Sequence, residues 1–185
     1  MLRHADPERD GAACAEIYAP SVRAGAASFE AEPPSTADMA SRIAAIARTH
    51  PWLVCERDGV VAGYAYASAH HDRAAYRWAA DVAVYVDARR HRSGVGRELY
   101  EALLSLLARQ RLQIACAGVT LPNDASVALH EALGFEPVGV YRAIGFKRGQ
   151  WHDVGWWQVR LRPPGDGPPE EPLGPQRLPA SSSPG

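Results

Sequence analysis

Residues 89–97 read Arg89-Arg90-His91-Arg92-Ser93-Gly94-Val95-Gly96-Arg97, and they join one apolar run to another. The run before them, over 79–86, is predicted to be a strand, and the run after them, over 94–108, repeats leucine at helical spacing. Glycines at such a junction let backbone N–H groups approach an anion closely, and the helix N-terminus adds the positive end of its dipole. The arginines add positive charge, so the stretch predicts a phosphate-binding turn.

The glycine spacing separates this turn from two common nucleotide-binding motifs. Neither G-x-x-x-x-G-K-[ST] nor G-x-G-x-x-G fits residues 89–97. A dinucleotide-binding sheet also opens with a strand and a glycine turn, whereas this chain opens with two predicted helices. A G-x-G alone at a strand–helix junction is equally compatible with ordinary turn chemistry.

Around the turn, local signals mark the ends of other elements. Asp6 before Pro7 predicts a helix start, Ser35 with Asp38 predicts a second one, and Asp58-Gly59 predicts a hairpin. In chain order we expect two helices, three strands, a helix, a strand, a helix and two strands, over 6–25, 35–46, 52–56, 60–68, 79–86, 94–108, 114–120, 123–133, 138–144 and 156–161. This order favours an α/β (α+β) fold, in which helices flank a mixed central sheet.

The composition changes sharply after Arg162. Residues 163–185 hold eight of the fifteen prolines but only two large apolar residues, Leu173 and Leu178. Such a segment buries too little apolar surface to offset the entropy lost on ordering. We therefore expect one folded domain over 1–162 and a disordered Pro/Gly/Ser-rich tail over 163–185, with a proline-rich ligand for a partner as the alternative.

Charge and hydropathy exclude several classes of protein. The 185 residues are 46% hydrophobic and 22% charged, and their net charge of −1 gives no reason to expect a nucleic-acid partner. No apolar run approaches the roughly 20 residues that span a bilayer, so no membrane partner is expected either. The N-terminus lacks the apolar core of a secretory signal. Cys14, Cys55 and Cys116 are widely spaced in apolar stretches, so reduced, buried thiols in a cytoplasmic protein are expected.

Further short stretches are specific when they are taken together with the turn. They are Glu16-Ile17-Tyr18, Ser28-Phe29, Glu32-Pro33, Tyr64-Ala65-Tyr66-Ala67, Val84-Tyr85-Val86, Leu121-Pro122-Asn123-Asp124, Leu129-His130-Glu131-Ala132-Leu133-Gly134-Phe135 and Trp151-His152-Asp153-Val154-Gly155. With them the chain resembles, from about residue 2 to residue 161, the GCN5-related N-acetyltransferases (GNAT), in the branch that acetylates phosphinothricin and methionine sulfoximine. The resemblance implies a GNAT fold and an acetyl-CoA-dependent N-acetyltransferase.

The same resemblance assigns the coenzyme site. It implies that acetyl-CoA is the co-substrate and that its pyrophosphate lies on the turn, at His91, Arg92, Ser93, Gly94, Val95, Gly96 and Arg97. His91 stands where relatives have Gln or Arg, and we expect it to be tolerated because the family uses main-chain N–H groups there. Pantetheine would lie along Val84, Tyr85 and Val86, where a backbone N–H polarises the thioester carbonyl. Asn123 would contact the coenzyme or the substrate.

Two residues are candidates for proton transfer. Asp81 stands where the branch carries a Glu that acts as general base, and Asp, one methylene shorter, would take the ammonium proton through water. His130 stands where many relatives have the Tyr that protonates the leaving thiolate. Without the resemblance, Asp81 is read as a strand-end cap or an ion-pair partner, and His130 as a histidine packed on the sheet. His130 as the base is the alternative assignment.

For the substrate, Arg73 and Tyr76 match an R-x-x-Y pattern of the branch. A guanidinium binds a carboxylate or phosphinate in bidentate fashion, and Phe29 would pack over the substrate side chain. From the residues alone, Arg73 is a solvated surface arginine and Phe29 a core residue. His70-His71-Asp72 is expected to be a solvated loop, and no metal is expected.

The sequence thus predicts transfer of acetyl to the α-amino group of a small amino acid or analogue, of the phosphinothricin, methionine sulfoximine or methionine sulfone type. Two alternatives stay open: a catalytically degenerate module that senses acyl-CoA, and an acetyltransferase for another amine such as a polyamine or a protein N-terminus. The expected partner is a small-molecule amine. A homodimer is expected because dimers are common in the branch.

Overall fold

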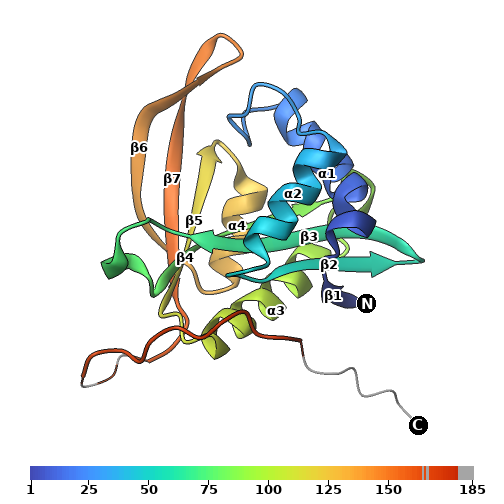
Figure 1. Cartoon of the computed structure of the whole chain (residues 1–185). Helices are drawn as coiled ribbons and strands as arrows, with labels where there is room; N and C mark the ends of the chain where they lie inside the picture. Colours follow the sequence, from blue (N-terminus) through green and yellow to red (C-terminus); the bar gives the residue numbers. More distant parts are fainter. Residues whose placement is uncertain (164, 166, 179–185) are drawn as a thin grey trace.

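The computed structural model describes residues 1–163, 165 and 167–178, and in this part of the chain seven strands form one sheet (Figure 1). Its order is β1-β2-β3-β4-β5-β7-β6. The strands are β1 (Leu2–His4), β2 (Trp52–Arg57), β3 (Val60–Ala69), β4 (Ala79–Val86), β5 (Ile114–Leu121), β6 (Glu136–Lys147) and β7 (Gln150–Arg160). The helices are α1 (Pro7–Arg23), α2 (Thr36–Ile46), α3 (Val95–Arg109) and α4 (Asp124–Ala132), with short 3-10 turns η1 (Ala74–Tyr76) and η2 (Ala88–Arg90). The predicted mixed sheet flanked by helices is confirmed.

The junction between β4 and β5 gives the sheet its shape. These two strands run parallel, whereas the other neighbouring pairs in the sheet are antiparallel. Their pairing covers only three positions and ends at Asp81 opposite Cys116. Beyond that pair β4 continues along β3, and β5 continues along β7. The two halves of the sheet therefore separate and leave a space between them.

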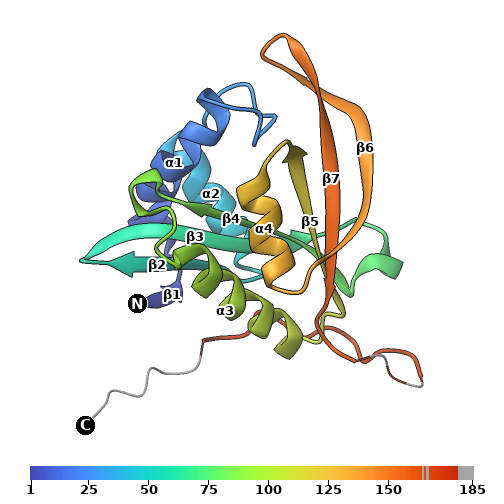
Figure 2. The ribbon, with the colours of Figure 1, turned by 180° about the vertical axis from the view of Figure 1, so that it is seen from behind.

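Helices cover both faces of the sheet, with α1 and α2 on one face and α3 on the other (Figures 1 and 2). The first face buries side chains such as Tyr18, Ile43 and Tyr64, and the second buries Leu99, Leu103 and Leu107 of α3. Strand alternation explains the division, because neighbouring residues of β2 contribute to opposite clusters. Burial of these apolar faces holds the helices against the sheet.

The capping signals in the sequence explain where the first two helices begin. The Asp6 side chain accepts hydrogen bonds from the backbone N–H groups of Glu8 and Arg9. Ser35 and Asp38 form the reciprocal capping box. At the predicted hairpin, Asp58 and Gly59 have φ of 55° and 75°, the left-handed values that a tight two-residue turn requires. These three predictions are confirmed.

The structure corrects the sequence-based elements in two places. The short strand β1 was not expected, because three residues carry too little alternation to predict a strand. Strands β6 and β7 are much longer than 138–144 and 156–161, and they extend to a turn at Arg148-Gly149. Cys14 and Cys55 are buried as expected, but Cys116 is only half-buried because it lies where the sheet opens.

The described part of the tail contains no helix or strand, but it contacts the domain. The backbone N–H of Leu173 donates to the carbonyl of Gln110 at 2.9 Å, and Glu171 pairs with Arg77 at 2.6 Å. Leu178 packs against the cluster beneath α3. Residues 164, 166 and 179–185 of the predicted tail lie outside the described residues, and disorder over 163–185 stays a prediction. Within the residues described, no helix is both long enough and apolar enough to cross a membrane.

Candidate active site

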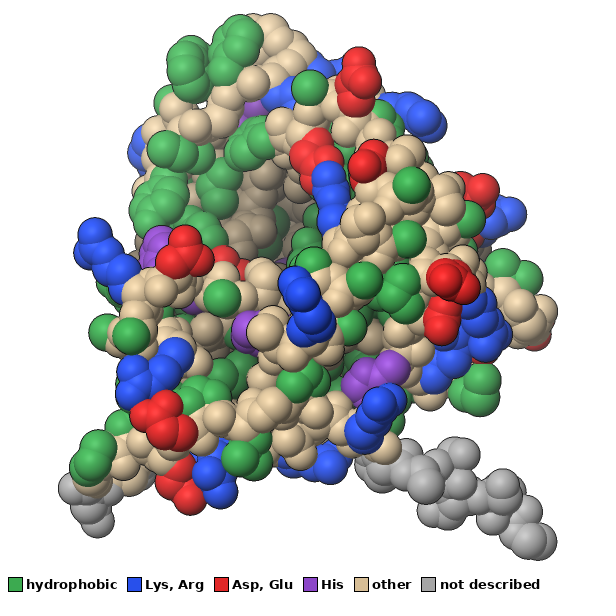
Figure 3. Space-filling view, in the orientation of Figure 1, with side chains coloured by type: hydrophobic (Ala, Val, Ile, Leu, Met, Phe, Trp, Pro, Cys, Tyr) green, Lys and Arg blue, Asp and Glu red, His purple; other side chains and the backbone are tan. Residues whose placement is uncertain are grey.

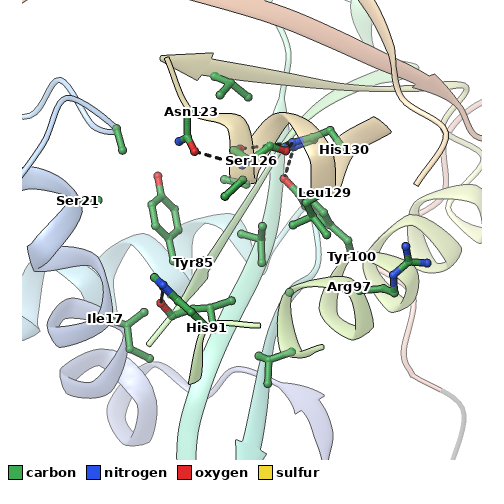
Figure 4. A pocket seen from close by; sticks show the side chains of 18 of the residues that line it. Ile17, Ser21, Tyr85, His91, Arg97, Tyr100, Asn123, Ser126, Leu129 and His130 are labelled. Atoms are coloured by element: carbon green, nitrogen blue, oxygen red, sulfur yellow. Dashed lines mark hydrogen bonds between the residues drawn. The ribbon is translucent and has the colours of Figure 1, made fainter. Parts of the chain in front are cut away.

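A cavity of about 730 Å³ occupies the space where β4 and β5 separate (Figure 4). One wall is the edge of β4, from Val82 to Val86, and the facing wall is Gly118–Thr120 of β5. The turn over 90–97 closes one end, and α1 contributes Ile17 and Ser21. The cavity therefore brings together the predicted phosphate turn, the predicted pantetheine strand and residues of α4.

The N-terminus of α3 is exposed to this cavity without a side-chain cap. Asp6, Ser35 and Asn123 cap the other helices, but among the described residues no side chain caps α3. Its N-cap residue is Gly94, with φ of 83°, a conformation in which a side chain is strained. The first N–H groups of any helix lack intrahelical partners, so those at the start of α3 face the cavity as free donors. An anion bound there would complete the helix and meet the positive end of its dipole.

The arginine side chains of the turn were predicted to supply positive charge to a phosphate, but most of them pair with carboxylates of the protein. Three of the four arginines are held by nearby carboxylates: Arg89 by Asp87, Arg90 by Asp58 and Arg97 by Glu101. Arg92 has φ of 61°, a left-handed value that is unusual for a residue with a side chain. The backbone of the turn therefore allows an anion to approach closely. Much of the positive charge on the side chains of the turn is already balanced by carboxylates.

His91 lines the cavity and also braces the turn. Its Nε2 lies 3.2 Å from the carbonyl oxygen of Val86, and because a carbonyl only accepts, Nε2 is the donor. The imidazole thereby links the turn to the end of β4. Tolerance of a histidine at this position for coenzyme binding stays a prediction.

On the opposite side of the cavity, both ring nitrogens of His130 of α4 make hydrogen bonds (Figure 4). Its Nδ1 donates to the carbonyl of Ser126 at 2.7 Å, and its Nε2 lies 3.0 Å from the Tyr100 hydroxyl. With Nδ1 protonated, the neutral ring accepts the Tyr100 proton at Nε2. Burial lowers the pKa of His130, so the neutral form is favoured. Asn123, which lines the same cavity, accepts from the N–H of Ser126 and caps α4.

Asp81 lies at the closed end of the space between the strands, and its contacts were not predicted. Its Oδ1 is 2.7 Å from Nδ1 of His70, the first residue after β3. Burial raises the pKa of the Asp81 carboxyl, and the hydrogen bond from His70 opposes this rise. Cys116 faces the same carboxyl, and burial together with Asp81 raises the pKa of its thiol to about 11. Asp81 thus lies within β4, and among the described residues its side chain pairs with His70 and with no arginine.

The atoms of this group resemble a metal donor set in type. One nitrogen of His70, one oxygen of Asp81 and the sulfur of Cys116 lie within 4.8 Å of one another. Two ligands of a tetrahedral zinc ion stand roughly 3.3 Å apart, given metal–ligand distances near 2 Å. The 2.7 Å between His70 and Asp81 is shorter than that and is a hydrogen bond. The group therefore fits a hydrogen-bonded cluster better than a metal site, and the expected absence of a metal stays a prediction.

The three predicted substrate residues fall in two places outside the cavity lining. Tyr76 lies edge-on to His71 at 4.9 Å and to His70 at 5.9 Å, which brings it beside the Asp81 group. Arg73 is exposed at the start of η1, three residues before Tyr76. Phe29, in the loop between α1 and α2, is 43% exposed and packs so closely on Gly145 of β6 that a methyl group there would overlap its ring.

The only lysine of the chain fixes the loop that carries Phe29. Lys147 Nζ donates to the backbone carbonyls of Val22, Ser28 and Glu30 at 2.6–2.9 Å. The loop is thereby attached to the β6–β7 hairpin, across a hollow that Figure 3 shows between the hairpin and the part of the molecule containing α1 and α2. This role of Lys147 was not predicted, since neither its spacing nor its neighbours in the sequence indicate three carbonyl partners.

The partners of the two candidate catalytic residues were not predicted. The sequence predicts a solvated loop for His70 and indicates no role for Tyr100. The signal for His70 was its position just after β3, the strand that pairs with β4, on which Asp81 lies. The register of β3 against β4 comes only from the structure. The signal for Tyr100 was a hydroxyl on a helix face that is otherwise apolar.

Comparison with known proteins is consistent with this geometry. A model of the acetyltransferase (GNAT) domain matches residues 4–156. The phosphinothricin N-acetyltransferase of Streptomyces viridochromogenes is 40% identical over 164 residues, which cover 89% of this chain and 90% of that protein. The L-methionine sulfoximine/L-methionine sulfone acetyltransferase of Salmonella typhimurium is 34% identical, with 86% and 94% covered. The structure of a phosphinothricin acetyltransferase from Sinorhizobium meliloti in complex with AcCoA has a TM-score of 0.87, 35% identity and 94% coverage of both chains.

Proposed function

Because this chain belongs to the GNAT acetyltransferase family, we propose that it transfers acetyl from acetyl-CoA to the α-amino group of a small amino acid or analogue, of the phosphinothricin or methionine sulfoximine type. The observation that carries the proposal is the cavity between the separated strands, with the uncapped start of α3 at one end. Relatives named for these two substrates match over most of the chain.

For the coenzyme, the turn from His91 to Arg97 receives the pyrophosphate through backbone N–H groups. The left-handed conformations of Arg92 and Gly94 support this assignment because they orient successive N–H groups toward one place. Pantetheine then runs along Val84, Tyr85 and Val86, and Asn123 lies on the opposite wall. The complex of the Sinorhizobium meliloti protein with AcCoA supports the same coenzyme here.

For the chemistry, Asp81 belongs to the group that accepts the ammonium proton, and His130 with Tyr100 supplies the proton of the leaving thiolate. Loss of a proton gives the amine a lone pair with which it attacks the thioester carbonyl. A backbone N–H at Val84, Tyr85 or Val86 stabilises the oxyanion that develops. Tyr100 and His130 both line the cavity, so the Tyr100 hydroxyl gives its proton to the thiolate while its oxygen stays hydrogen-bonded to His130 Nε2.

For the substrate, Arg73 binds the carboxylate or phosphinate, Tyr76 lies beside the proton-accepting group, and Phe29 covers the substrate side chain. The placement of Tyr76 next to His70 supports this arrangement. The attachment of the Phe29 loop by Lys147 supports it as well, because a fixed loop gives the substrate a rigid wall.

A homodimer is part of the proposal, as is a cytoplasmic location. Large hydrophobic side chains gather on the β6–β7 hairpin (Figure 3) and are exposed: Val138, Tyr141, Ile144, Phe146 and Trp151. Contiguous exposed apolar surface of this kind is typical of protein interfaces. Sedimentation of the purified protein measures the oligomeric state directly.

The test of the proposed function is thiol release from acetyl-CoA with a panel of amines. The panel holds phosphinothricin, methionine sulfoximine, methionine sulfone, ordinary amino acids, a polyamine and a short peptide. Release with the amino-acid analogues is expected. Release only with the polyamine or the peptide would refute the substrate assignment, and binding of acetyl-CoA without release by any amine would favour a sensor.

A further inference from the structure

The contact between His70 and Asp81 joins the end of β3 to β4 where β4 and β5 are still paired, one residue before Val82 at the cavity wall. Asp81 lies on β4 opposite Ser68 of β3, and His70 follows two residues after Ser68. Side chains two residues apart on a strand lie on one face, so His70 reaches Asp81 diagonally across the strand pair. The His70 side chain is 22% exposed and that of Asp81 34%, so both remain open to a small molecule.

The hydrogen bond fixes which ring nitrogen of His70 is available. An ionised carboxylate can only accept, so Nδ1 of His70 carries the proton that it shares with Asp81. In the neutral ring Nε2 then holds a lone pair. Among the residues that the structure describes, Nε2 of His70 makes no hydrogen bond. The arrangement is that of a histidine oriented by an aspartate, with its second nitrogen ready to accept a proton.

The length of the side chain at position 81 gives the hydrogen-bonded His70–Asp81 pair a function in catalysis. Asp81 has a single methylene, so its carboxyl stays close to β4. An imidazole hydrogen-bonded to that carboxyl extends the reach of the basic group. Asp81 also holds the ring in one orientation, because the two side chains are partly buried against each other.

We propose that His70 Nε2 is the atom that accepts the proton of the amine substrate, and that Asp81 orients and stabilises the His70 ring. This inference rests on the proposed N-acetyltransferase function. The ammonium group gives one proton to Nε2, and the neutral amine then attacks the thioester carbonyl carbon. The C–N bond forms, the C–S bond breaks and the electron pair leaves with the sulfur. The nitrogen loses its second proton after the attack, the thiolate takes one proton, and His70 returns its own to solvent.

The interpretation of a pH–rate profile depends on the groups that face His70. They are Asp81 from β4, Cys116 from β5, Trp156 from β7 at 6.1 Å between ring centroids, and His71 and Tyr76 from the same loop. Asp81 carries a negative charge, and His71 carries a positive charge only when it is protonated. His71 makes no hydrogen bond to Asp81 within the described residues, so it serves as the control histidine.

The decisive experiment compares H70N with H71N and wild type, by steady-state kinetics across pH. Asn at position 70 keeps an N–H near the place of Nδ1, so it can still donate to Asp81, but it has no basic nitrogen. We expect kcat of H70N to fall by about 10²-fold or more. The KM for acetyl-CoA and the Tm should be unchanged, and the acidic limb of the kcat/KM profile should be altered. H71N should stay within a few-fold of wild type.

A second variant separates chemistry from packing. In H70G, added imidazole should restore part of the lost rate in proportion to its concentration, because a free base can then occupy the space of the ring. An H70N enzyme within threefold of wild type, or an H70G enzyme that imidazole does not restore, would overturn the assignment. Failure of the proposed function looks different, since wild type itself would then release no thiol with any amine.

Discussion

Asp81 and Cys116 face each other in the last parallel pair between β4 and β5, and the sheet opens immediately beyond them. Strand register therefore holds the carboxyl one residue before Val82, where the cavity wall begins. The same placement removes water from both side chains and raises both pKa values. A carboxylate that is costly to ionise is poised to share a proton, which explains its hydrogen bond to His70.

Substitution of Asp81 by Asn should separate stability from activity. Because the pKa of Asp81 is raised in the folded state, the folded protein holds this proton more tightly than the unfolded chain. The resulting stability is present at low pH and is lost as pH rises through the folded pKa. At neutral pH the D81N variant should therefore have a higher Tm than wild type, while its kcat falls by about 10²-fold or more.

Asp87 provides the control with the opposite sign. Arg89 lowers the pKa of Asp87 to about 2, so its ionised form stabilises the fold at neutral pH. Thermal unfolding of D87N should show a lower Tm than wild type at pH 7, and this difference should shrink as pH falls through the folded pKa. A D81N protein that is less stable than wild type at pH 7, or equally active, would contradict the account of Asp81.

The uncapped helix start predicts a selective effect of G94A. Gly94 and Gly59 both have φ near +80°, and neither has a neighbour within 4 Å of an added Cβ. An alanine is strained at either position and costs about 1 kcal/mol of unfolding free energy. Only Gly94 lies at the cavity, so G94A should raise the KM for acetyl-CoA while G59A lowers the Tm alone. Equal KM values in the two variants would remove the turn from coenzyme binding.

Much of the fold could be predicted because its local signals are strong. The caps at Asp6 and Ser35, the Asp58-Gly59 hairpin and the glycine turn at Gly94 each depend on a few neighbouring residues, and each appears as expected. Strand β1 could not be predicted, since its three residues become a strand only by pairing with β2. The length of β6 was underestimated because its residues are largely exposed and show no clear alternation of burial.

Only those residues of the candidate site that belong to a sequence motif could be predicted. The turn and Asn123 line one cavity, as their motifs implied. The partners of Asp81 and His130 depend on which strands pair and on side-chain direction, and no local pattern contains that information. For this reason the contact between His70 and Asp81, at 2.7 Å, was not predicted.

The Arg73 side chain should matter for an anionic substrate and not for the coenzyme. A bidentate contact to a carboxylate or phosphinate is worth about 1.5–3 kcal/mol, which corresponds to roughly 10–100-fold in KM. R73Q should therefore raise the KM for the amino-acid substrate by that factor and leave the KM for acetyl-CoA unchanged. R77Q is the matched control, because Arg77 pairs with Glu171 in the tail. Equal effects of the two variants would argue against Arg73 as the anion-binding residue.

His130 should affect both the pH dependence of stability and the chemical step. Since burial lowers its pKa in the folded state, the unfolded chain binds this proton more readily, and stability is lost as pH falls below about 6.5. H130Q should lack this component of acid sensitivity. If His130 protonates the thiolate, kcat of H130Q also falls by about 10²-fold. Y100F is the comparison, and full activity of H130Q would leave His130 with a packing role only.

Removal of the tail after Arg162 should lower the Tm slightly and leave catalysis unchanged. The hydrogen bond from Leu173 to Gln110 and the partial burial of Leu178 are together worth about 1 kcal/mol, or about 2–4 °C in a chain of this size. The ion pairs of the tail are exposed and add little. These contacts reach the C-terminal end of α3, whereas the phosphate turn precedes its N-terminal end, so kcat and both KM values should be unchanged. L178A in the full chain should account for part of the difference in Tm. An unchanged Tm would mean that the described tail does not hold these contacts in solution, and a changed kcat would connect the tail to the active site.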